Sequence, residues 1–114
     1  MSLLSIYDEY IKVNKAYVEF INEIVNNNFN GYSQEEIMTI LVDGKNKFEE
    51  LRSKTDKEEV LDEDDVNLKD LKYLVIDGLF LSIDLFNFYN CKEIERFKMR
   101  AINYIRKRRV ADFF

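Results

Sequence analysis

The chain lacks histidine, proline and tryptophan, and its 114 residues include only three glycines and one cysteine. Without histidine there is no Ser-His or Cys-His nucleophilic pair and no imidazole for general acid-base chemistry. The same absence, with a single thiol, removes the usual ligand sets of zinc sites and di-iron bundles. The sequence therefore favours a non-enzymatic protein. We expect no cofactor, and no residue is assigned a catalytic, cofactor-binding or metal-binding role.

The single thiol, Cys91, cannot form an internal disulfide, which is typical of proteins from a reducing compartment. The beginning of the chain lacks the basic stretch and apolar run of a signal peptide. The most apolar stretch, residues 74–89, is short for a membrane span and is interrupted by Asp77 and Asp84. We therefore expect a cytoplasmic protein without membrane insertion. Asn, Ile and Lys occur 11 times each, a composition that resembles AT-rich bacterial genomes.

Apolar residues recur at helical spacing through most of the chain, and little in it breaks a helix. This pattern predicts an all-α fold with helices at about residues 4–28, 33–54, 67–89 and 92–109. Ser33 followed by Glu36 is a capping box that marks the start of the second helix. Residues 55–66 are charged and aperiodic, which predicts a loop. Short turns then favour one domain over residues 1–114, an antiparallel four-helix bundle.

The third predicted helix is apolar on nearly all sides, which favours a central position in the bundle or burial in a homodimer. Asp65 or Asn67 is the expected N-cap of this helix. Gly31 is expected to end the first helix in a left-handed conformation. Gly44 and Gly78 both fall on apolar helix faces, where glycine costs about 1 kcal/mol of helix propensity. Close helix packing explains them best, and the alternative is a helix break that opens a pocket.

Charge is strongly polarised, with a net charge of −10 over residues 1–90 and +5 over residues 91–114. On the last helix, helical spacing predicts a cationic stripe opposite the apolar face, formed by Lys92, Arg96, Arg100 and Lys107. Arg106, Arg108 and Arg109 surround the end of that helix. Cations at a helix C-terminus complement its dipole, which is the simplest interpretation. The alternatives are docking of an acidic or helical protein, nucleic-acid binding, and membrane-surface binding anchored by Phe113 and Phe114.

Three carboxylates, Asp70, Asp77 and Asp84, repeat every seven residues and so share one side of the third helix. Oxygen ligands suit Mg²⁺, so an all-α metal-dependent nucleotide hydrolase is an alternative. Successive members of this series are about 10 Å apart along a helix, however, which is too far for one ion. A solvated or salt-bridged stripe is the simpler interpretation. The acidic residues 62–65 lack the spacing, glycine and glutamate of a calcium loop.

The chain has nine phenylalanines and seven tyrosines, and several crowd into the end of the third helix. Core packing explains most of them, and exposed ones would form a partner surface. We therefore expect a small bundle that binds a protein partner by a helix-in-groove contact, as export chaperones, immunity proteins or small regulators of bacteria do. The candidate partner-binding residues are Lys92, Arg96, Arg100, Arg106, Lys107, Arg108, Arg109, Phe86, Phe88 and Tyr89.

Overall fold

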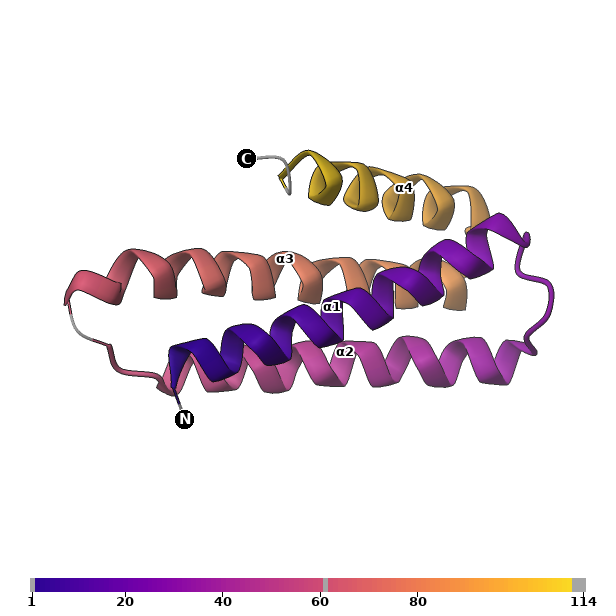
Figure 1. Cartoon of the computed structure of the whole chain (residues 1–114). Coiled ribbons are helices and arrows are strands. Elements are labelled where there is room, and N and C mark those ends of the chain that lie inside the picture. Colours follow the sequence, from indigo (N-terminus) through magenta and orange to yellow (C-terminus); the bar gives the residue numbers. More distant parts are fainter. Residues whose placement is uncertain (1, 61, 112–114) are drawn as a thin grey trace.

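The computed structural model describes residues 2–60 and 62–111, with the side chains of this part up to Lys107. Within this part the chain forms four α-helices, one 3-10 turn and no strand (Figure 1). These elements are α1 (Leu3–Asn26), α2 (Gln34–Lys57), η1 (Asp62–Asp64), α3 (Asp65–Asn90) and α4 (Ile94–Ala111). The predicted all-α four-helix bundle is confirmed.

The helices differ in length, and this difference shapes one end of the bundle. α2 and α3 lie side by side, α1 crosses them obliquely, and α4 runs along α3 and beside α1 (Figure 1). α3 has 26 residues and α4 has 18, so α4 is about 12 Å shorter at the rise of an α-helix. α4 therefore stops short of the end of the bundle where α1 and α3 begin (Figure 1).

α3 is the central helix, because it packs against each of the other three. Its buried side chains occupy several sides of the helix, which explains why the sequence shows so little amphipathic pattern there. These buried apolar residues are Leu68, Leu71, Val75, Leu79, Leu81 and Leu85. Burying each side chain of this kind stabilises the fold by about 1.5–3 kcal/mol.

Two glycines let the helices approach closely around one aromatic pair. Gly44 faces the ring of Tyr17, and Gly78 faces the ring of Phe48. A methyl group at Gly78 would lie 2.5 Å from Phe48 Cε1, so a larger residue does not fit without a shift. The Tyr17 and Phe48 rings pack edge to face with their centroids 5.6 Å apart. Both glycines lie inside unbroken helices, so the packing interpretation holds and the helix-break alternative is wrong.

The start of α2 agrees with the prediction, and its end does not. Ser33 Oγ accepts a hydrogen bond from the Glu36 backbone N–H at 3.1 Å, and Glu36 Oε1 accepts one from the Ser33 N–H. α2 continues to Lys57 because Thr55 is buried and its hydroxyl donates back to the Arg52 carbonyl at 2.8 Å. The predicted loop at 55–66 was therefore too long.

Two predicted helix caps were wrong. α1 ends at Asn26, and the left-handed residues that follow directly are Asn28 and Phe29, with φ of 51° and 64°. Gly31 has the predicted left-handed conformation, with φ of 91°, but it lies beyond the cap of α1. Phe29 tolerates this conformation because its ring packs into the aromatic cluster at that end of the bundle. At the other end, the N-cap of α3 is Asp64, whose side chain makes no capping hydrogen bond.

Candidate interaction surface

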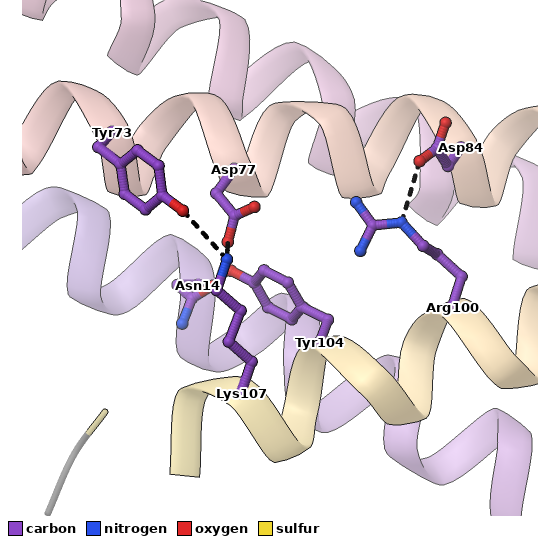
Figure 2. Close-up of polar contacts among 7 residues, drawn as sticks. All are labelled: Asn14, Tyr73, Asp77, Asp84, Arg100, Tyr104 and Lys107. Atoms are coloured by element: carbon purple, nitrogen blue, oxygen red, sulfur yellow. Dashed lines mark hydrogen bonds and ion pairs between the residues drawn. The ribbon is translucent and has the colours of Figure 1, made fainter. Parts of the chain in front are cut away.

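The basic helix α4 is joined to the acidic side of α3 by two contacts. Arg100 Nε donates a hydrogen bond to Asp84 Oδ2 at 3.0 Å. Lys107 Nζ lies 3.5 Å from Asp77 Oδ2 and donates to the Tyr73 hydroxyl at 3.2 Å (Figure 2). The seven-residue spacing of the carboxylates thus matches the seven-residue spacing of the cations. This arrangement confirms a salt-bridged stripe for two of the three predicted carboxylates.

The contacts of Lys107 also affect its ionisation. The hydrogen bond to Tyr73 and the charge of Asp77 raise the pKa of the Lys107 ammonium group above its ordinary value. The Lys107 side chain is 52% exposed and that of Arg100 is 29% exposed. Both cations therefore sit at the edge of the apolar face of α4, beside α3, and not opposite that face as the sequence predicted.

A second polar contact holds α4 against α1. The buried Tyr104 donates its hydroxyl proton to Asn14 Oδ1 at 2.6 Å (Figure 2). Phe97 and Ala101 are buried on the same face of α4. α4 therefore lies over the line where α1 meets α3.

The other predicted cations are placed differently. Arg96 is exposed and pairs with Glu93 at 3.3 Å, and Arg106 is exposed. Lys92 precedes α4 with a left-handed φ of 60°, so it is not part of the helical stripe predicted for it. Arg108 and Arg109 belong to α4, but their side chains lie outside the described ones.

The aromatic residues predicted for partner binding pack against the core. Phe86, Phe88 and Tyr89 are all half-buried against it. Tyr89 stacks on Phe29 with ring centroids 5.9 Å apart, and Lys45 lies 5.4 Å from the centroid of the Phe86 ring. These three rings therefore serve mainly to join the elements at this end of the bundle.

The largest exposed aromatic side chains of α3 are two that sequence reasoning missed. Tyr73 is 59% exposed and Phe80 is 56% exposed. With the half-buried Ile76 and Ile83 they recur at helical spacing on the one side of α3 that no neighbouring helix covers. We call these four residues the α3 strip. The sequence did contain a sign of this strip, because α3 is apolar on nearly all sides. A helix of that kind with three neighbouring helices leaves apolar residues exposed on its remaining side.

Cations flank the α3 strip. Lys107 and Arg100 lie along its α4 side, where they neutralise Asp77 and Asp84. Lys72 lies toward the other side of α3, and Lys69 lies one heptad before Ile76, in line with the strip, and pairs with Asp65 at 2.9 Å. The strip is thus an apolar surface bordered by ion pairs.

The three predicted carboxylates do not converge. Asp77 and Asp84 contact separate cations of α4, and Asp70 is exposed beside the N-terminus of α3. Over residues 2–60 and 62–111, no three acidic or cysteine side chains come together in a way that could hold a metal ion. In the same part of the chain, no helix is long and apolar enough to cross a membrane.

Comparison with known proteins gives no assignment. No protein-family model matches the chain, and neither the curated proteins nor the solved structures contain a significant match.

Proposed function

We propose that this chain is a non-enzymatic helical-bundle protein of chaperone, immunity or regulatory type that binds a helix of a protein partner on the α3 strip. The exposure of Tyr73 and Phe80 on an otherwise buried helix carries the proposal. Contiguous exposed apolar surface marks interaction sites, and aromatic residues are enriched in them. We also propose, from the lone exposed thiol Cys91 and the composition, that the protein is cytoplasmic and bacterial.

The dimensions of the strip suit a helical partner. Tyr73 and Phe80 are two turns apart, about 10.5 Å along α3. An amphipathic helix presents its own anchors at the same interval and would pack its apolar side against these rings. Ile76 and Ile83 supply the half-buried floor between and beside the two aromatic side chains.

Ion pairs border the strip, so we expect a partner helix with polar or charged residues along its edges. Lys107 donates to the Tyr73 hydroxyl at 3.2 Å, and Arg100 pairs with Asp84 on the same flank. Lys69 and Lys72 lie on α3 within about one turn of Tyr73. The protein carries a net charge of −5, but charges beyond about 8 Å are screened at physiological salt. The ion pairs beside the strip therefore matter more there than the net charge of the whole chain.

Capture experiments with matched variants test this proposal. Phe80→Glu alters the strip, and Met99→Glu alters an apolar residue on the outer side of α4 that is more exposed than Phe80, at 67%. We expect wild type and the Met99 variant to retain the same bound protein from an extract of the source cells, and the Phe80 variant to lose it. Loss in both variants would contradict a site on α3.

Two controls identify other occupants of the surface. Sedimentation of the purified chain shows whether a second copy occupies the strip; a dimer that Phe80→Glu dissociates would replace the partner proposal with a homodimer. Titration with DNA and RNA tests the nucleic-acid alternative, for which the exposed Arg96 and Arg106 are the candidate contacts. Binding that weakens steeply with salt would favour that alternative.

A further inference from the structure

A pocket of about 470 Å³ opens at the end of the bundle where α1 connects to α2 and α3 connects to α4 (Figure 1). Residues of both connections line it, together with the first residues of α2 and α4 and the last of α3. Proteins bind small molecules in pockets of about 300–1,000 Å³ that combine an apolar lining with a few polar groups. This pocket shares no residue with the α3 strip, so a ligand bound there is independent of the proposed function.

The half-buried side chains of the pocket are all apolar or aromatic, and they include the rings of Phe29, Tyr32 and Tyr89. The Phe29 and Tyr89 rings stack on each other, and both also pack against the buried Phe97. The Tyr32 hydroxyl donates a hydrogen bond to Glu23 Oε1 at 3.2 Å, which restricts the motion of its ring. Rings held in this way form a surface that is already shaped for a flat apolar group.

The exposed side chains of the pocket are polar, and only one of them is charged. They are Asn28, Gln34, Asn90 and Lys92. Asn28 Oδ1 accepts a hydrogen bond from Lys98 Nζ at 3.1 Å, which leaves the amide N–H groups of Asn28 to donate elsewhere. Lys92 forms no ion pair with any residue that the structure describes, because Glu93 and Glu95 pair with other cations of α4. An ammonium group without a counter-ion, surrounded by amide donors, suits an anionic ligand.

The backbone at Lys92 indicates that its side chain has a role here. Lys92 follows the C-cap of α3 with a φ of 60°, and the next residue, Glu93, donates its N–H to the Phe88 carbonyl at 2.8 Å. Glycine is the usual residue at this position of a helix end, because a Cβ disfavours the left-handed conformation. Lysine there lowers stability and places a cation beside the pocket. Asn28 and Phe29, the other left-handed non-glycine residues of the described chain, also line the pocket, and strained backbone of this kind clusters at functional sites.

We propose that this pocket binds a small aromatic carboxylate, whose ring lies against Tyr32 and Tyr89 and whose carboxylate pairs with Lys92. The single ammonium group matches the one negative charge of a carboxylate, whereas a phosphate group carries about −1.5 to −2. The amides of Gln34 and Asn90 are the candidate hydrogen-bond donors to the same carboxylate. The ligand is thus recognised by its flat ring and its single charge together.

Three naphthalene derivatives that differ in charge test this proposal on the full chain: 2-naphthoate, the neutral 2-naphthalenemethanol and the cationic 2-naphthylmethylamine. We expect 2-naphthoate to bind with a Kd below about 1 mM, and about fivefold more tightly than the neutral derivative, because only the carboxylate pairs with Lys92. An NMR titration should shift the backbone signals of residues 28–38 and 89–94. Absence of saturation by 2-naphthoate, equal affinity for all three derivatives, or shifts centred on the groove at Leu4 and Tyr7 would each overturn the proposal.

Variants of Lys92 separate binding from folding. Lys92→Gly should raise the urea midpoint, because glycine suits the left-handed conformation, and should weaken 2-naphthoate binding about fivefold, to the affinity of the neutral derivative. Lys92→Glu should reverse the preference, so that the amine binds more tightly than the carboxylate. Lys47→Ala removes an exposed cation of α2 outside the pocket and should leave the affinity unchanged. Unchanged 2-naphthoate binding in Lys92→Gly, or an equal loss in Lys47→Ala, would contradict the assignment of Lys92 as the anion-binding group.

Discussion

Arg100 on α4 and Asp84 on α3 form a hydrogen-bonded ion pair of 3.0 Å, and the Lys107–Asp77 contact repeats it one heptad later in α4 and one heptad earlier in α3. Part of the positive charge of α4 is therefore neutralised by carboxylates of α3 within the molecule. Two cations of the basic helix serve to align it on its acidic neighbour. This pairing places a row of two ion pairs along the α4 side of the α3 strip.

The Arg100–Asp84 pair should contribute measurably to stability. Each side chain is partly shielded from solvent, so we expect a coupling free energy of about 0.5–1 kcal/mol in a double-mutant cycle with alanine, measured by urea unfolding. The exposed Lys47–Asp43 pair on α2 is the control and should show a smaller coupling. Equal coupling in the two pairs would mean that the α3–α4 contact is not a specific alignment device.

Two buried tyrosines should respond oppositely to removal of the hydroxyl group. Tyr104→Phe removes the hydrogen bond to Asn14 and should lower the free energy of unfolding by about 1–2 kcal/mol. The Tyr17 hydroxyl is buried without a hydrogen-bond partner among the described residues, so Tyr17→Phe should be neutral or stabilising. Urea unfolding of both variants measures this, and a similar loss in both would contradict the assigned contacts.

Tyr17 should also make stability sensitive to alkaline pH. Burial raises the pKa of its phenol well above the ordinary value near 10, with a smaller contribution from Tyr104. Folded protein thus retains a proton that the unfolded chain releases above about pH 10. The associated stability is fully present below that pH and is lost as the pH rises.

Comparison with a variant isolates this effect. In Tyr17→Phe, the urea midpoint should fall less steeply between pH 9 and about pH 11 than in wild type. Other tyrosines with raised pKa values, Tyr32 and Tyr89, are present in both proteins and cancel in the comparison. If the urea midpoint fell equally steeply with pH in both proteins, Tyr17 would ionise normally in the folded state.

Enlarging the central glycine should destabilise the bundle although alanine is the better helix former. Gly78→Ala gains about 1 kcal/mol of helix propensity. Its methyl group would press on the Phe48 ring, and overpacking of this kind costs about 1–3 kcal/mol. Chemical denaturation should show a net loss that Phe48→Leu reduces. Asn46→Ala, on the exposed side of α2, is the control and should be mildly stabilising.

The fold was predictable because it depends on local patterns. Helical spacing and the Ser33–Glu36 capping box identified the helices, and the apolar phase of Gly44 and Gly78 identified both as packing positions. The ends of α1 and α3 were missed because tertiary contacts decide them. Phe29 becomes left-handed through its aromatic neighbours, and no capping side chain marks Asp64.

The candidate surface was predictable only in part. Periodicity showed that α3 is apolar on nearly all sides, but it could not show which side its three neighbours leave open. Phe86 and Tyr89 were therefore favoured over Tyr73 and Phe80. The clustering of aromatic residues near the end of α3 had been taken as a sign that some of these side chains are exposed. Arg100 was assigned to the outer face because a helical wheel does not place the neighbouring helix.

Site-specific photo-crosslinking in cells of the source organism tests the α3 strip most directly. A photoreactive phenylalanine analogue at position 80, and separately at position 73, should yield the same discrete protein adduct. The analogue at position 99, which is at least as exposed, should yield none. Adducts of equal strength at positions 80 and 99, or none at position 80, would contradict the assignment of this strip as the partner-binding surface.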